Sequence, residues 1–145
     1  MFSNNLLGIF LIGILGILWI WSLKQVRGGN TFKTTPWLLP LGIFVWGDGL
    51  VILLFWIAWL IFSMLVQNIY ISLTLWALFW VVRSLGEVIY WLNQQFSIIK
   101  RNDPKSLLGG KLFGEGVWFV YQIAWQCVLV IMIFVTIWSL RFWNI

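Results

Sequence analysis

Residues 69–95 read IYISLTLWALFWVVRSLGEVIYWLNQQ, a long apolar run that carries Arg83 and Glu87 in its interior. The run lacks the strict alternation of an outer-membrane barrel strand, and its length is that of a membrane-spanning helix. An ionised side chain in hydrocarbon is costly unless it is paired, so by default such residues mark a functional site or a structural ion pair. The stretch therefore predicts a transmembrane helix with a polar centre.

The composition of the whole chain agrees with this prediction. Of 145 residues, 62% are hydrophobic and only 9% are charged. An ordinary soluble domain could not cover so much apolar surface with water-compatible groups. The length accommodates four helices of about 20 residues each and leaves no room for a soluble catalytic domain. We expect an all-α polytopic membrane protein.

Four apolar runs are separated by segments that contain polar residues, proline or glycine. The expected helices lie at about 6–23, 37–66, 69–95 and 113–142. They predict a four-transmembrane-helix bundle that forms a single transmembrane domain over residues 1–145. No basic residue precedes the first run and no small-residue cleavage site follows it, so we expect a retained helix rather than a secretory signal.

Basic residues are concentrated in two of the three loops. These loops are residues 24–36, with Lys24, Arg27 and Lys33, and residues 96–112, with Lys100, Arg101, Lys105 and Lys111. The positive-inside rule places both loops in the cytoplasm and both termini on the other side; Arg141 alone disagrees. We expect the cell membrane, with an organellar inner membrane as the alternative. Contact with anionic headgroups of the lipid bilayer explains the net charge of +5, and no nucleic acid is needed to explain it.

The chain has no histidine and a single cysteine, Cys127, in the fourth run. Haem sites, zinc sites and catalytic triads therefore lack their usual ligand or base, and no internal disulfide can form. We expect no cofactor and no metal. Cys127 is interpreted as a small apolar residue of the core.

The second apolar run is the least regular. Thirty helical residues would extend about 45 Å, which exceeds the roughly 30 Å hydrocarbon core. The run contains Gly47, Asp48 and Gly49 in succession. One hypothesis is that the glycines let the chain unwind and turn carbonyl groups toward a bound cation. The alternative is that they only allow a neighbouring helix to approach closely.

Depth along the helices suggests that the charged residues could meet. Arg83 and Glu87 are four residues apart, so they lie on one helix face and can pair. Counting along each helix at ~1.5 Å per residue places Asp48 in the same layer near the midplane. Together the three residues carry one negative charge. A convergent site would therefore hold a proton or a small cation, or would be a structural ion pair with one carboxyl protonated.

The fourth run offers polar partners for this layer. Gln122 and Gln126 are four residues apart at matching depths, and Glu115 lies on the same stripe nearer the cytoplasmic end. Tyr90 and Gln94 extend the stripe of Arg83 and Glu87 on the third run. We expect one interior polar core, with the charged residues and the residues of the fourth run forming a substrate- or ion-binding site.

Three functional hypotheses follow. The first is an ion- or proton-coupled transporter or channel protomer, which would form a homo-oligomer because four helices alone make a poor pathway. The alternative is a non-catalytic structural or assembly subunit that binds partners in a larger membrane complex. The third is a lipid-acting enzyme with Asp48 or Glu87 as base, which no sequence signature supports, so we expect no enzymatic activity.

Overall fold

The computed structural model describes residues 2–98, 102–107 and 109–143. Within these ranges the regular structure is helical, apart from one isolated antiparallel bridge between Thr34 and Val45. Lys100 and Arg101 of the third loop lie outside the described residues. Four helical spans are long and apolar enough to cross a membrane: Leu6–Arg27, Trp46–Val66, Ile69–Phe96 and Gly110–Leu140. The predicted all-α fold with four transmembrane helices is confirmed.

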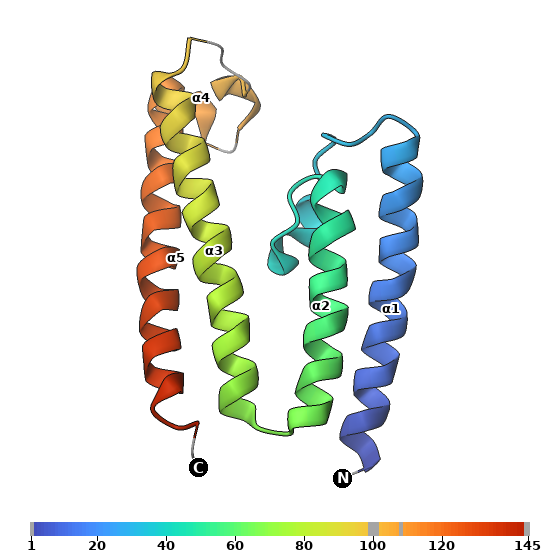
Figure 1. Ribbon diagram of the computed structural model, residues 1–145. Helices are drawn as coiled ribbons and strands as arrows, with labels where there is room; N and C mark the ends of the chain where they lie inside the picture. The colour runs from blue at the N-terminus through green and yellow to red at the C-terminus, as the bar shows by residue number, and fades with distance from the viewer. Residues whose placement is uncertain (1, 99–101, 108, 144–145) are drawn as a thin grey trace. The chain divides into compact units, whose positions relative to one another are not determined.

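The chain divides into two compact units, Met1–Ser72 and Leu73–Ile145. The first contains α1 (Phe2–Arg27), the short 3-10 helix η1 (Pro36–Leu41), α2 (Trp46–Val66) and the first turn of α3 (Ile69–Phe96) (Figure 1). The second contains the rest of α3, followed by η2 (Pro104–Ser106), α4 (Gly110–Phe113), η3 (Gly114–Gly116) and α5 (Val117–Leu140). A single transmembrane domain over the whole chain stays a prediction.

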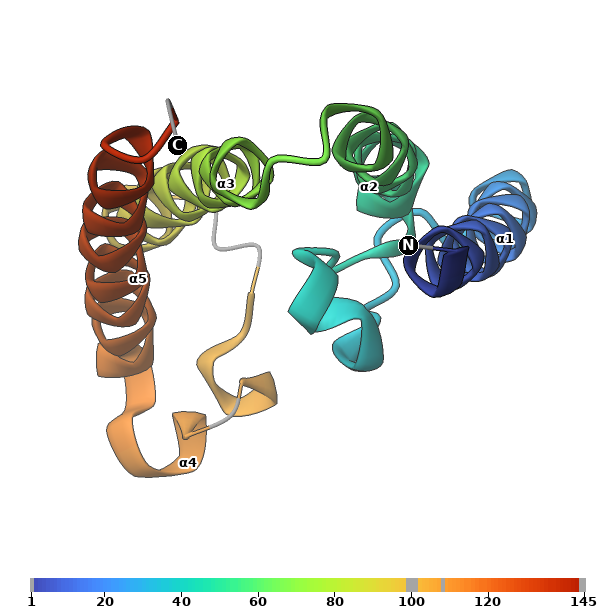
Figure 2. The same ribbon diagram turned by 90° about the horizontal axis from the view of Figure 1, so that it is seen from below.

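Helices α1 and α2 lie side by side in the first unit (Figure 1 and Figure 2). A Cβ atom added to Gly49 would lie 2.5 Å from the Oγ atom of Ser22, a fully buried residue of α1. The indole N–H of Trp19 donates to the carbonyl of Leu50 at 3.1 Å. Gly49 therefore permits close approach of the two helices, as the second of the two hypotheses for this glycine states.

Helix α2 begins at Trp46, so the predicted helix over 37–66 was too long at its start. The start of the predicted helix forms η1 instead, which contains Pro40 and is followed by Gly42 with a φ of 78°. Proline offers no N–H to a helix, and a positive φ is readily adopted only by glycine. Val45 is then extended, and a regular α-helix starts after it.

Residues 34–45 fold back along α2 (Figure 1). The amide of Thr35 donates to the carbonyl of Phe44 at 2.8 Å, and the indole N–H of Trp56 donates to the carbonyl of Leu41 at 2.9 Å. Trp56 lies about 15 Å along α2 from its first residue, at ~1.5 Å per residue. This irregular segment thus packs against protein over several turns of a membrane-spanning helix, as irregular backbone at membrane depth requires.

We expect Trp56→Phe to loosen this segment, because phenylalanine keeps the ring but cannot donate to Leu41. The loss should be about 1 kcal/mol of local stability. Hydrogen exchange of the Thr35 and Ile43 amides in vesicles measures it, and both should exchange faster. Trp59→Phe is the matched control, since the Trp59 indole donates to Ser72 instead. Unchanged exchange in the Trp56 variant would contradict the prediction.

In the second unit, hydroxyl groups and an indole join α3 to the end of α5. The Oγ atoms of Thr74 and Ser139 are 2.7 Å apart, and the indole N–H of Trp143 donates to Thr74 at 2.9 Å. Thr74 and Ser139 are both buried. Because small polar residues can hydrogen-bond between membrane helices, this group fixes the two helices at one end.

The other helix boundaries also differ from the prediction. The predicted fourth helix at 113–142 is interrupted: α5 begins only at Val117, because Gly114 takes a φ of 54° and ends α4. The first helix is longer than residues 6–23 and reaches Arg27. Lys24 and Arg27 lie in its last turn, where positive charge complements the helix dipole.

Candidate functional site

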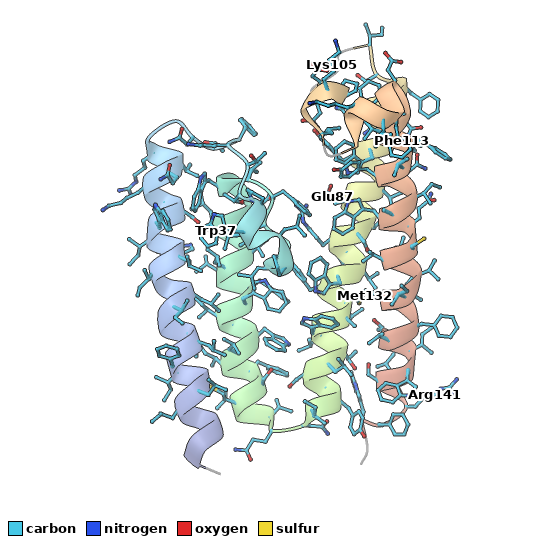
Figure 3. All side chains as sticks on the ribbon, turned by 180° about the vertical axis from the view of Figure 1, so that it is seen from behind. Trp37, Glu87, Lys105, Phe113, Met132 and Arg141 are labelled. Atoms are coloured by element: carbon cyan, nitrogen blue, oxygen red, sulfur yellow. The ribbon has the colours of Figure 1, made fainter. Side chains whose placement is uncertain are left out.

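Four side chains spaced four residues apart, Arg83, Glu87, Trp91 and Gln95, follow one face of α3. Together with Gln122 of α5 they are named the polar row here. The Arg83 Nη1 atom lies 3.1 Å from Glu87 Oε1. The indole N–H of Trp91 donates to the other carboxylate oxygen, Oε2, at 3.1 Å. Both oxygens of Glu87, which Figure 3 labels, therefore have a donor from the same helix.

The predicted pairing of Arg83 with Glu87 is confirmed. The pair is near the middle of α3, with Arg83 about 20 Å from either end at ~1.5 Å per residue. The two side chains are 20% and 12% exposed. Their opposite charges cancel, and the indole N–H adds a further hydrogen bond to the carboxylate. Their role in binding an ion or substrate stays a prediction.

The polar row reaches α5 through two glutamines. The side-chain amide of Gln95 donates to the Gln122 oxygen at 2.5 Å and to the backbone carbonyl of Trp91 at 3.3 Å. The Trp91 and Tyr121 rings pack with their centroids 4.7 Å apart. Gln122 is buried. The contact between Gln95 and Gln122 thus joins the two helices, and a role for Gln122 in an ion- or substrate-binding site stays a prediction.

Tyr90 and Gln94 serve a different purpose from the one expected. The side-chain amide of Asn102 donates to the Tyr90 hydroxyl at 2.6 Å, and the Asn102 backbone N–H donates to the Gln94 oxygen at 3.2 Å. Gln94 is buried. This half of the predicted stripe anchors the connector after α3.

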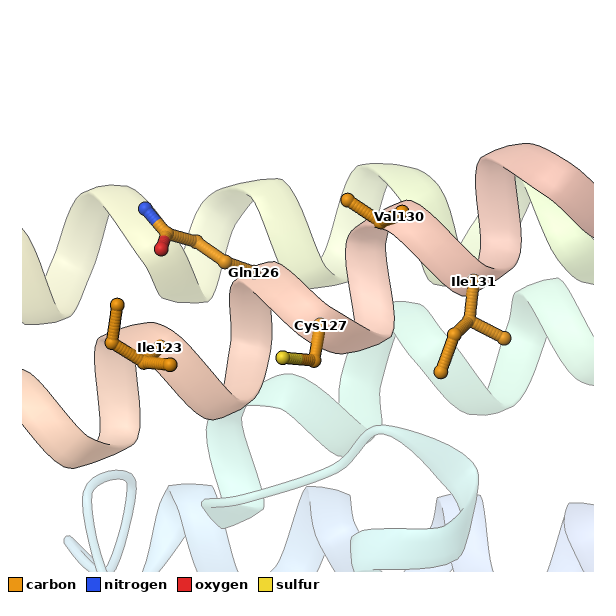
Figure 4. A pocket seen from close by; sticks show the side chains of 5 residues that line it. All are labelled: Ile123, Gln126, Cys127, Val130 and Ile131. Carbon is orange, nitrogen blue, oxygen red and sulfur yellow. The ribbon is translucent and has the colours of Figure 1, made fainter.

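The structure does not bring Gln126 or Glu115 to the polar row. Glu115 is exposed in η3, where the interruption before α5 removes it from the helical stripe. Gln126 lines a shallow depression on α5, shown in Figure 4, with Ile123, Cys127, Val130 and Ile131. Among the described residues, neither side chain forms a hydrogen bond or an ion pair with the row. A continuous polar lane along the fourth run is therefore not formed.

Asp48 lies in the first turn of α2, and its Oδ2 atom accepts the backbone N–H of Phe44 at 3.0 Å. The N–H of Gly47 donates to the carbonyl of Thr31 at 2.9 Å. A carboxylate in the first helical turn is favourable because it faces the positive end of the helix dipole. The helix is continuous through Gly47 and Gly49, so the hypothesis of local unwinding there is wrong.

Asp48 belongs to the first unit, and Arg83 and Glu87 belong to the second. Convergence of the three therefore stays a prediction. Each charge already has a favourable local partner: a helix N-terminus for Asp48, and each other for Arg83 and Glu87. The net negative charge of the three residues does not require a bound cation in this arrangement.

Trp91 and Gln95 are the members of the row that the sequence interpretation missed. Trp91 is near the end of its run, where an indole is typical of the membrane interface, so its residue type did not indicate a place in the row. The available signal was the spacing, since Trp91 and Gln95 continue the four-residue repeat from Arg83 and Glu87.

In the part of the chain that the structure describes, no three or more Cys, Asp and Glu side chains gather so as to hold a metal ion. By its fold class the chain is an all-α, membrane-embedded protein. Comparison with protein-family models, with curated proteins and with solved structures finds no match. The polar row is therefore the basis for the functional proposal.

Proposed function

We propose that the protein is a non-catalytic integral membrane component that acts through contacts between its helices and those of other membrane chains. The observation that carries this proposal is the pairing of the Glu87 carboxylate, one oxygen with Arg83 and the other with Trp91. A carboxylate held in this way is neutralised and hydrogen-bonded without an external ion. The intramembrane charges then have a structural role, and the protein acts through its exposed apolar helix faces.

The exposed faces support this proposal. Large apolar side chains stand out from the membrane-spanning helices, among them Ile17 of α1, Val51 of α2, Val82 of α3 and Phe134 of α5. Such faces can be covered by lipid or by the helices of a partner, and in either case they offer no group that would bind an ion or a polar substrate.

We further propose that the basic loops 24–36 and 96–112 lie on the cytoplasmic side of a cell membrane, with both termini on the opposite side. The basic ends of α1 and of η2 and α4 support this orientation, with Lys24, Arg27, Lys105 and Lys111 in last helical turns. Arg141, at the opposite end of α5, is the single basic residue against it.

Ion- or proton-coupled transport is the second candidate function. It is favoured by the position of Arg83 and Glu87 at the middle of a membrane-spanning helix, where ionisable residues are functional by default. In a transport cycle the Arg83–Glu87 pair would have to open, so that Glu87 could exchange its partner for a proton or a cation.

Flux measurements on reconstituted protein distinguish the two candidates. We expect vesicles with the wild-type chain to conduct protons and K⁺ no faster than protein-free vesicles under an imposed membrane potential. A pH-sensitive dye inside the vesicles reports the proton flux. The variant R83Q/E87Q, which removes both charges together, should give the same result.

Protein-dependent flux would contradict the proposed function. If R83Q/E87Q abolished that flux while remaining folded and inserted, transport would be assigned to the pair. Glu115→Gln is the matched control, because it makes the same carboxylate-to-amide change at an exposed position outside the row.

A further inference from the structure

Gln126 is a polar side chain in an apolar setting. It lies about 14 Å from the first residue of α5 and about 21 Å from the last, at ~1.5 Å per residue. The side chains that line the depression around it are Ile123, Cys127, Val130 and Ile131 (Figure 4). Among the described residues no hydrogen bond involves its carboxamide. In hydrocarbon such a group is left with two donors and one acceptor unsatisfied, which is costly.

Gln122, four residues earlier, shows how a glutamine side chain within the membrane obtains a hydrogen-bond partner in this protein. Its carboxamide oxygen accepts a hydrogen bond from Gln95 of the neighbouring helix α3. The exchange of hydrogen bonds between side chains of adjacent helices is a known source of helix association in membranes. Gln126 has the same chemistry but lies on a different part of the α5 surface.

We propose that α5 forms the interface of a homodimer, in which the Gln126 carboxamides of two copies hydrogen-bond to each other. This inference rests on the proposed function, since it identifies a second copy of the chain as a helix partner. A carboxamide is self-complementary, because its N–H₂ group donates and its oxygen accepts. A two-fold axis places the same residue of two copies face to face, so one contact satisfies both side chains. Lipid acyl chains can neither donate nor accept such a hydrogen bond.

The surroundings of Gln126 fit a helix–helix seam. Residues spaced alternately three and four apart form one stripe along α5: Ile123, Gln126, Val130, Ile133 and Ile137. The four apolar members are between 40% and 57% exposed. Branched side chains on such a stripe interdigitate with an identical helix, and the single polar residue fixes the register. The stripe therefore has the pattern of a specific seam.

Both copies cross the membrane in the same direction, so the two-fold axis runs along the membrane normal and equal residues meet at equal depth. Cys127 follows Gln126 directly at the edge of the stripe and is exposed, so its interpretation as a core residue was wrong. The two Cys127 thiols would then flank the axis within reach of a short crosslinker. Crosslinking of the native Cys127 thiols therefore reports on the interface.

The test uses the full chain in lipid vesicles at low protein density, treated with the membrane-permeable crosslinker bismaleimidoethane. We expect a covalent product of twice the chain mass from the wild type. Gln126→Leu keeps the size and the cysteine but removes the hydrogen bonds, and should lower the association constant about three- to thirtyfold. Gln126→Asn keeps a carboxamide and should recover much of the association. Analytical ultracentrifugation in mild detergent measures the association constants.

Absence of a wild-type dimer by both methods would overturn the proposal, as would equal association of Gln126→Leu and wild type. Protection of Cys127 from maleimide without a dimer would show that other helices of the same chain cover this face, and would overturn it too. A monomer without ion flux would remove this interface and leave the proposed function standing. Ion flux from a dimer that depends on Gln126 would support this interface and contradict the proposed function.

Discussion

Replacing Glu87 with glutamine is expected to lower the free energy of unfolding by roughly 3 kcal/mol, because Arg83 then lacks its counter-charge near the middle of α3. The two side chains are 20% and 12% exposed, so the lower end of the range for buried pairs applies. The Trp91 indole also loses a charged acceptor. Denaturant titration in bicelles, followed by tryptophan fluorescence, measures the change.

The control for this experiment is Glu115→Gln, the same substitution at an exposed residue of η3. It should change the unfolding free energy by less than about 0.5 kcal/mol. If Glu87→Gln were as stable as this control, the pair would not be structural.

Gly49→Ala is expected to destabilise the packing of α1 on α2 by about 1–3 kcal/mol, as overpacking of a tight contact does. The added Cβ atom would lie 2.5 Å from the Ser22 Oγ atom and 3.2 Å from its Cβ atom. The helices would have to separate, which also weakens the hydrogen bond from Trp19 to Leu50. Thermal unfolding in bicelles measures the loss.

Gly16→Ala is the matched control, because a Cβ atom there meets nothing within 4 Å. Its effect should be neutral or stabilising by up to about 1 kcal/mol, from helix propensity. A second variant, Gly49→Ala with Ser22→Ala, removes the oxygen at 2.5 Å and should recover part of the loss. Strictly additive losses in that double variant would show that Ser22 is not the cause.

The membrane-spanning helices could be predicted from composition because a long apolar run has few alternatives in a bilayer. The third run illustrates this: α3 extends over Ile69–Phe96, against a prediction of 69–95. Apart from the paired Arg83 and Glu87 it has no charged residue, and no proline interrupts it.

Residues 37–45 could not be assigned in the same way. Their side chains are as apolar as those of α2, so hydrophobicity does not distinguish a helix from an irregular segment packed on one. Pro40 and Gly42 were the local signals for a break. The contact that places the segment, from Trp56 to Leu41, joins residues 15 positions apart and has no local signature.

Prediction of the candidate site was equally uneven. The pairing of Arg83 with Glu87 follows from their spacing on one helix, which needs no tertiary information. Gln122 and Gln126 are alike in type and depth, yet among the described residues only Gln122 has a hydrogen bond to α3. A step of four residues along an α-helix turns the side-chain direction by about 40° beyond a full turn. That difference separates a residue in the helix–helix hydrogen bond from one outside it.

The most direct test of a structural role for the intramembrane charges is the coupling free energy between Arg83 and Glu87. It is obtained from the unfolding free energies of the wild type, R83Q, E87Q and R83Q/E87Q under one condition. A structural ion pair predicts that each single variant is strongly destabilised and that the double variant returns to within about 1 kcal/mol of the wild type. Losses that simply add, leaving the double variant the least stable of the four, would contradict it.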